Sequence, residues 1–476
     1  MHAGMMTAMI DETPKPAYTA VGRVRRVAGQ VVTIECTGTY RPALGELLTG
    51  ATDTAIRLEA YAYHGEALLR CLLLSQVGGL SRHTEVVSTG APISLPVGGA
   101  LLGRAINLYG EPVDGGLALE APERRSITVP ERMPGTLAGA GTILETGLKA
   151  VDFFAPIREG GRTALVGGAG VGKTVMQTEI LRHFLTRSSK SVSVFAGIGE
   201  RVREGHALWE LLREQGVLAD TSLIFGYINK NAAIRFRSAA AAATLVEYFR
   251  DTEGKDILFF IDNVFRFLQA GAELSTLLGE IPSEFGYQPT LQSEIAQFEN
   301  RLASTKRGSV TSIQTLYVPS DEFENPAVTA TLAHMDTVII FSREMAARGW
   351  RPALDPLRSS SEALRPAVVG EAHYQAVTSA NTVLNQYDRL ERIVSIVGEE
   401  ELSQENQQTF RRAQRLQFYM TQPLLTTSIE DGKPGVSVLR ADVVRDVEAI
   451  LAGKFDEVPA EKLLFIGDLK SAGLLH

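Results

Sequence analysis

The chain has 476 residues, 45% of them hydrophobic, so it is too long for one ordinary domain and can bury a large core. Its net charge of −8 disfavours a dedicated nucleic-acid-binding protein, because such proteins are usually basic. Its two cysteines exclude a disulfide framework, and no apolar run reaches the roughly 18 residues that a membrane-spanning helix needs.

The first 17 residues contain neither a basic-then-apolar signal pattern nor an arginine. We therefore expect no export or organelle signal, and we predict a short mobile tail (1–17) on a cytoplasmic protein. From residue 18 to 93, short alternating runs are separated by turn residues, as in the hairpin expected around His64-Gly65-Glu66. Several such strands predict a small β-barrel.

From residue 94 to 367, β-rich runs alternate with helix-forming runs, which predicts an α/β domain with a mostly parallel sheet. The expected strands cover residues 163–166, 192–196, 223–228, 257–261, 310–318 and 337–341. Such sheets bind ligands at the carboxyl ends of their strands. From residue 368 to 476, apolar residues recur at helical spacing, as at Val383, Tyr387 and Leu390, and predict an α-helical third domain.

Residues 167–174 read GGAGVGKT and match the phosphate-binding loop pattern GxxxxGK[ST] at every position. An apolar strand leads into this loop, and a helix from Lys173 to about Arg187 leads out of it. Lys173 can reach the terminal phosphates of a nucleotide, and the Thr174 hydroxyl can bind Mg²⁺. The nucleotide-binding residues that we expect here are Gly167, Gly168, Ala169, Gly170, Val171, Gly172, Lys173, Thr174 and Val175.

Acidic residues follow two of the other expected strands. Asp262 ends the run ILFFID and can orient magnesium directly or through water. Glu200 follows the strand at 192–196, and it lies at the same sheet end if that strand neighbours the phosphate-loop strand. A glutamate there can orient and deprotonate an attacking water, and Arg201 and Arg266 can balance phosphate charge. A surface loop of paired charges explains residues 199–205 equally well.

Taken together, these motifs resemble the catalytic β subunit of F-type rotary ATP synthases, over nearly the whole chain from residue 18. The resemblance depends on ordered segments as well as on the loop. They are GAPISLPVG at 90–98, LGR at 102–104, ILETG at 143–147, GER at 199–201, FIDNVFRF at 260–267, GYQPT at 286–290 and DPL at 355–357.

The resemblance implies a β-barrel at 18–93, a RecA-like nucleotide domain at 94–367 and a helical domain at 368–476. It implies that Lys173 and Arg201 hold the γ-phosphate with Arg266 close by, and that Glu200 orients the attacking water. Magnesium would be held by Thr174, with Glu204 and Asp262 acting through its water shell. The substrates would be ATP, or ADP and phosphate.

The family further implies partners: three noncatalytic α subunits that alternate with three such chains around a γ shaft, other synthase subunits, and an arginine finger from α. It implies an ion-translocating enzyme attached peripherally to the cytoplasmic face of the bacterial inner membrane. The coupling ion, proton or sodium, stays open. Glu200 distinguishes the chain from the α subunits, which lack the catalytic glutamate.

Several positions depart from the family pattern and predict a divergent, accessory branch. Arg351 stands where the family has a tyrosine against the adenine, and Trp350 precedes it; either side chain could cover a purine. Tyr419 and Leu424 match two phenylalanines of the adenine pocket. Arg358 and Glu362 exchange charges at an expected subunit contact, and the rotor-facing motif at 400–406 has fewer carboxylates.

Two other readings stay open. A relative with the same core could drive protein export or move RNA, but residues 18–93 carry no basic-aromatic stripe for nucleic acid. A regulatory, noncatalytic nucleotide-binding subunit would require Glu200 to lie away from the phosphates.

Overall fold

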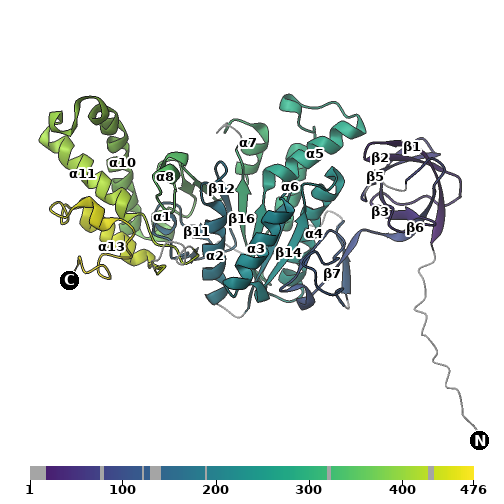
Figure 1. The fold of residues 1–476 in the computed structure, drawn as a ribbon, viewed down its shortest axis with the longest axis horizontal. Helices are drawn as coiled ribbons and strands as arrows, with labels where there is room; N and C mark the ends of the chain where they lie inside the picture. Colours follow the sequence, from purple (N-terminus) through teal and green to yellow (C-terminus); the bar gives the residue numbers. More distant parts are fainter. Residues whose placement is uncertain are drawn as a thin grey trace, which may run out of the picture. The chain divides into compact units, whose positions relative to one another are not determined.

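The computed structural model describes residues 18–75, 80–120, 123–128, 141–187, 190–318, 323–426 and 434–475 (Figure 1). The predicted tail at 1–17 lies outside these ranges. The chain divides into two compact units, Met1–Ser94 and Leu95–His476.

The first unit is a closed barrel, as predicted. Its six strands are antiparallel and follow the order β1-β2-β5-β4-β3-β6. They are β1 (Thr19–Ala28), β2 (Val31–Cys36), β3 (Glu46–Gly50), β4 (Arg57–His64), β5 (Leu68–Leu73) and β6 (Glu85–Pro92). Inward residues such as Val24, Ile34 and Leu69 are fully buried, and closure leaves no unpaired sheet edge.

The second unit is built on an eight-stranded sheet in the order β18-β17-β12-β16-β15-β13-β14-β8. All neighbouring strands are parallel except β17 and β18. The strands are β8 (Ala105–Ile106), β12 (Arg162–Val166), β13 (Ser191–Ile198), β14 (Thr221–Gly226), β15 (Asp256–Asp262), β16 (Val310–Leu316), β17 (Thr337–Ile340) and β18 (Ser360–Ser361). Two small pairs accompany the sheet: β7 (Ser94–Val97) with β9 (Glu123–Ser126), and β10 (Ile143–Leu144) with β11 (Ile157–Arg158).

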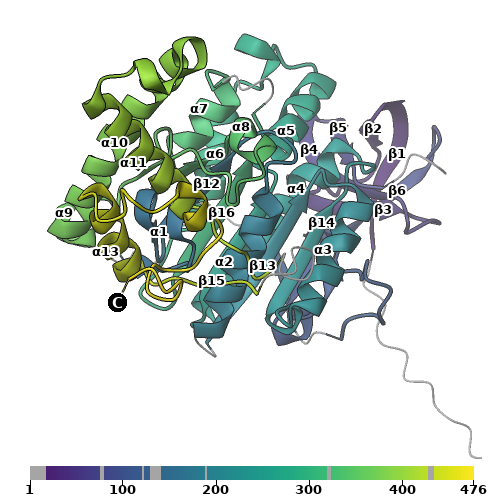
Figure 2. The same ribbon diagram turned by 60° about the vertical axis from the view of Figure 1, so that its left-hand side comes forward.

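Helices cover both faces of this sheet (Figure 2). Right-handed crossovers put α2 (Lys173–Arg187) and α3 (Val202–Glu214) on one face. The other face carries α4 (Ala232–Asp251), α5 (Val264–Leu278), α6 (Leu291–Arg301) and α7 (Pro326–Leu332), with α4 packed on α5 and α6. Strands buried on both faces explain the continuous apolar runs in the sequence.

The C-terminal region is helical, as predicted. Its helices are α9 (Pro366–Val369), α10 (Glu371–Val397), α11 (Gln404–Tyr419) and α13 (Arg440–Leu451), and α1 (Lys149–Phe154) packs against α10 and α13. Ser403 is the N-cap that precedes α11, and its side chain accepts a hydrogen bond from the backbone N–H of Asn406. One buried core joins Leu165 and Ile180 of the nucleotide domain to Leu416 and Val443 of these helices. The boundary expected near residue 367 therefore falls inside one compact unit.

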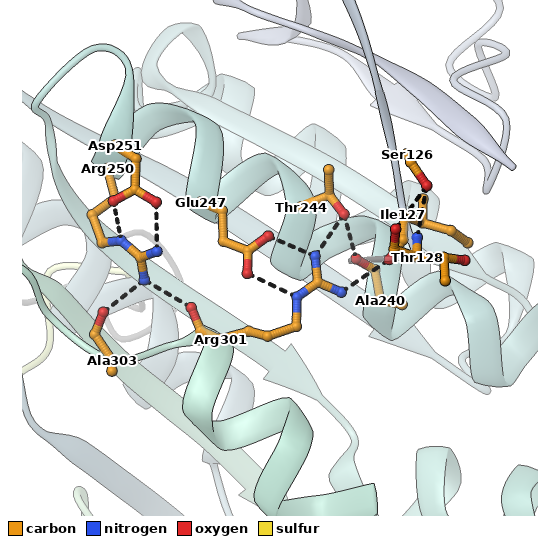
Figure 3. A network of polar contacts seen from close by, with 10 residues as sticks. All are labelled: Ser126, Ile127, Thr128, Ala240, Thr244, Glu247, Arg250, Asp251, Arg301 and Ala303. Atoms are coloured by element: carbon orange, nitrogen blue, oxygen red, sulfur yellow. Dashed lines mark hydrogen bonds and ion pairs between the residues drawn. The ribbon is translucent and has the colours of Figure 1, made fainter. Parts of the chain in front are cut away.

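Near the amino ends of β15 and β16, two arginines are held by partners within the chain (Figure 3). Arg301 pairs with both carboxylate oxygens of Glu247, at 2.9 and 2.7 Å. Arg250 pairs with Asp251 and also donates to the carbonyls of Arg301 and Ala303. This network, which we call the amino-edge network, joins the end of α4 to the end of α6.

Among the described residues, none of the helices is both long and apolar enough to cross a membrane.

Candidate functional site

The phosphate-binding loop lies between β12 and α2, as the sequence predicts. Gly170 and Gly172 have φ values of 75° and 93°, a backbone region that favours glycine. The ammonium group of Lys173 donates to the carbonyl oxygen of Gly167 at 3.0 Å and to that of Gly168. Lys173 is therefore held at the mouth of the loop, where α2 begins.

Glu200 and Asp262 follow two adjacent strands, β13 and β15, which are paired in parallel with Gly197 opposite Asp262. β13 does not neighbour the phosphate-loop strand, because β16 and β15 separate it from β12. The residues still share one edge of the sheet, since all four strands are parallel and their carboxyl ends meet there.

These acidic groups and Lys173 lie within electrostatic reach of one another. Burial raises the pKa of Glu200, and the nearby Asp262 raises it further. Burial also raises the pKa of Asp262, while a 2.6 Å hydrogen bond from the Thr315 hydroxyl and the charge of Lys173 oppose that rise. In turn, burial lowers the pKa of Lys173, against the effects of Asp262 and Glu200. The structure thus brings the predicted ammonium and both predicted carboxylates together.

Glu204 completes the acidic group from the first turn of α3. A hydrogen bond with Glu200 lowers the pKa of Glu204, so the two carboxyl groups share a proton that Glu200 retains. Burial and the neighbouring acids raise the pKa of Glu200 to about 9, so in the ligand-free chain its carboxyl group holds the shared proton at neutral pH.

The two predicted arginines differ in their placement. Arg266 packs against Gly199, because a Cβ atom added at Gly199 would lie 2.8 Å from the Cβ of Arg266. The positive charge of Arg266 lowers the pKa of Glu200. The Arg201 side chain is 69% exposed, and its guanidinium nitrogen lies 3.8 Å from a carboxylate oxygen of Glu204. Arg266 is therefore part of the packed wall of the site, whereas Arg201 is at its surface.

Arg343 is a further cation at this site that the sequence analysis missed. Its guanidinium lies directly against Gly168, where an added Cβ would come within 2.6 Å of it, and its charge contributes to the lowered pKa of Lys173. Arg343 opens α8 (Arg343–Ala347) soon after β17. Because β17 is parallel to β12 and beside it, a basic residue just after that strand was a usable signal.

The residues present fit a magnesium ion bound together with a nucleotide. The described residues contain no group of three or more His, Cys, Asp and Glu side chains that could hold a metal alone. Thr174 at the start of α2, Asp262 and Glu204 offer hydroxyl and carboxylate oxygens, the donors that magnesium prefers, and phosphate oxygens usually complete such sites. Clustered carboxylates with raised pKa values would be stabilised by that charge.

A cavity of about 260 Å³ opens beside the loop. The predicted residues Val175, Trp350 and Arg351 line it, and so does Leu424. Trp350 is held edge-on against Phe418, with the ring centroids 5.7 Å apart. The walls of the cavity combine apolar side chains with few polar ones, as is usual for small-molecule sites. They are formed by Leu148, Gly170, Val171, Gly172, Val175, Met176, Glu179, Phe341, Ala346, Gly349, Trp350, Arg351, Pro352, Ala353 and Leu424.

The predicted place of Tyr419 in this cavity must be corrected. The Tyr419 side chain is fully buried and does not line the cavity. Its hydroxyl donates to Asp446 at 2.9 Å, and the ammonium of Lys149 lies 4.2 Å from its ring centroid. A tyrosine hydroxyl needs a partner when buried, and Asp446 on α13 turns the ring into the helical core.

Known families match two parts of the chain. Residues 147–361 match the ATP synthase alpha/beta family, nucleotide-binding domain. Residues 362–453 match a model described as the C-terminal domain of V and A type ATP synthase. Two relatives named ATP synthase subunit beta 2, from Burkholderia pseudomallei strains 1106a and 1710b, are each 43% identical over 454 residues. Each match covers 95% of this chain and 86% of the relative.

Proposed function

Since the chain belongs to the ATP synthase β-subunit family, we propose that it is the catalytic subunit of a membrane-associated rotary ATP synthase. It would make ATP from ADP and phosphate with energy from a transmembrane ion gradient, and it would hydrolyse ATP in reverse. The observation that carries this proposal is the convergence of Lys173, Glu200 and Asp262 at one edge of the sheet.

In this proposal Lys173 and the amide groups of the loop bind the phosphates, with Arg266 and Arg201 beside the terminal one. Glu200 positions the attacking water and accepts its proton in hydrolysis, and it returns a proton in synthesis. Its raised pKa supports this role, because a carboxylate with a higher pKa is a stronger proton acceptor.

Magnesium would be held by Thr174 and, through water, by Glu204 and Asp262. When bound, the ion neutralises charge on the transferred phosphate. Asp262 is prepared for this by its hydrogen bond from Thr315, which fixes the carboxylate at the strand end.

The proposed complex alternates this chain with noncatalytic α subunits around a γ shaft, at the cytoplasmic face of a bacterial inner membrane. An arginine finger from α would complete the phosphate site, a contribution of about 10³–10⁵ in rate. The exposed Arg201 and Glu204 support such an arrangement, because they leave one side of the site open to a neighbour. The departures at Arg351 and Leu424 support an accessory branch of the family.

The test is ATP hydrolysis by the chain reconstituted with α and γ partners, comparing the wild type with Glu200→Gln. Loss of a general base should lower turnover by about 10²–10⁴-fold. Glu210→Gln is a matched control, because Glu210 lies on α3, the helix that follows Glu200, and pairs only with His206 and Arg213 in the ion pairs described. It should retain full activity. Equal turnover of Glu200→Gln and the wild type, in complexes of equal composition, would reject the catalytic assignment and favour a regulatory subunit.

A further inference from the structure

One wall of the cavity beside the phosphate loop comes from a segment of the C-terminal region, residues 422–426. Leu424 is the member of this segment that lines the cavity, and its side chain is 5% exposed. The position of Leu424 depends on how the chain on either side of it is attached.

The first attachment is at Gln422, which is almost fully buried. Its backbone N–H donates to the carbonyl of Arg351 at 2.8 Å. Its side-chain amide donates to the carbonyl of Gly147 at 2.8 Å and accepts from the backbone N–H of Lys149 at 2.9 Å. These bonds fix the segment to the loop before α1 and to the cavity residue Arg351.

The second attachment is at Thr426. Its backbone N–H and its hydroxyl both donate to the same carboxylate oxygen of Glu179, at 2.5 and 2.7 Å. Glu179 is 5% exposed and itself lines the cavity. Hydrogen bonds to a carboxylate are stronger than those between neutral groups, so these two bonds hold Thr426 strongly against Glu179.

Glu179 belongs to α2, the helix that begins at Lys173. One helix therefore carries the phosphate-binding groups in its first turn and the anchor of the Leu424 wall in its second. Nothing in the expected phosphate chemistry requires a carboxylate at position 179, which lines the cavity.

We propose that Glu179 is a positioning residue for the nucleobase. By holding Thr426, it keeps Leu424 against the base that enters the cavity. This inference rests on the proposed function, because it takes the ligand to be a nucleotide whose phosphates occupy the loop. Loss of the contact frees the wall and weakens the contact with the base, while the phosphate ligands stay in place.

The experiment compares two ligands with the full-length chain by calorimetry in the presence of Mg²⁺: ADP, which has a base, and inorganic tripolyphosphate, which has none. Glu179→Met removes the acceptor, and Thr426→Val removes the hydroxyl donor while keeping the shape. Glu179→Met should weaken ADP binding about five- to fiftyfold and Thr426→Val about three- to tenfold. Tripolyphosphate affinity should change less than about twofold in both.

Thr426→Ser is the matched control, because it keeps the hydroxyl and should bind ADP like the wild type. Lys173→Ala should weaken both ligands. Equal losses of ADP and tripolyphosphate affinity in Glu179→Met and Thr426→Val would mean that the contact only supports the fold of α2, and unchanged ADP affinity in Thr426→Val would also overturn the proposal. A wild type that binds neither ligand would instead reject the proposed function itself.

Discussion

The two edges of the central sheet carry similar residues with opposite electrostatic outcomes. At the amino edge, the arginines and carboxylates of the amino-edge network satisfy one another within the chain (Figure 3). At the carboxyl edge, Glu200 and Asp262 lie half-buried near each other and their pKa values are raised. Paired opposite charges stabilise a fold, whereas neighbouring groups of like charge are typical of a ligand-binding site.

This difference predicts that substitutions at the amino edge affect stability and those at the carboxyl edge affect binding. Three experiments test that division.

The largest effect on stability should come from Arg301→Met. The Arg301 and Glu247 side chains are only 17% and 18% exposed, and the change leaves the carboxylate without its bidentate partner. We expect a loss of about 3–5 kcal/mol in the free energy of unfolding of the nucleotide domain. Urea denaturation measures it.

The double variant Arg301→Met/Glu247→Leu should recover much of that loss, because no unpaired buried charge remains. Arg201→Met at the exposed Glu204 pair should change stability by less than about 0.5 kcal/mol. Comparable losses in the free energy of unfolding from Arg301→Met and Arg201→Met would contradict the proposed difference between the two edges.

The second effect is on binding. Lys173→Ala removes the ammonium at the mouth of the loop, and charge-assisted bonds are each worth about 1.5–3 kcal/mol. ADP affinity of the full-length chain should therefore fall about ten- to a hundredfold by calorimetry, with the unfolding midpoint of the ligand-free chain nearly unchanged. If affinity stays the same while stability falls, Lys173 is a structural residue like those of the amino edge.

The smallest effect is a gain in stability. Because the pKa of Glu200 is raised, the folded chain holds this proton more tightly than the unfolded chain does. The free energy of unfolding of the wild type therefore falls as the pH rises above the ordinary glutamate pKa of about 4.3. The Glu200→Gln variant has no titrating group at this position, so its free energy of unfolding does not fall in this way. The ligand-free variant should therefore be about 1 kcal/mol more stable than the wild type at pH 8 and close to it at pH 4.5.

Urea denaturation of both chains at the two pH values measures this gain. A glutamine variant that is less stable than the wild type at pH 8 would mean that Glu200 is satisfied within the fold. It would then belong with the amino-edge carboxylates, and the contrast would not hold.

Local patterns were sufficient for much of the fold. The loop pattern, the strand before it and the helix from Lys173 to Arg187 are found where the sequence predicted them. The same is true of the barrel hairpin around Gly65. Apolar periodicity and turn residues act over a few positions, so one sequence is enough to read them.

Long-range placement was not available in that way. The order of the strands put β16 and β15 between the phosphate loop and Glu200, yet the parallel direction still brought the acids to one edge. Tyr419 was assigned to the base cavity, but Asp446 on another helix turns it into the core. Arg343 reaches Gly168 only because β17 lies beside β12.

The sequence by itself therefore determined which chemistry the chain carries: a phosphate loop, acids after apolar strands, and helices at the C-terminus. The tertiary structure alone decided which charges neutralise each other and which face a ligand. It also decided that Glu179 should meet Thr426, across 247 positions of the chain. Desolvation and charge pairing depend on neighbours that only folding brings together. For this reason the Glu179 carboxylate holds Thr426 in place, whereas Glu200 is suited to proton transfer.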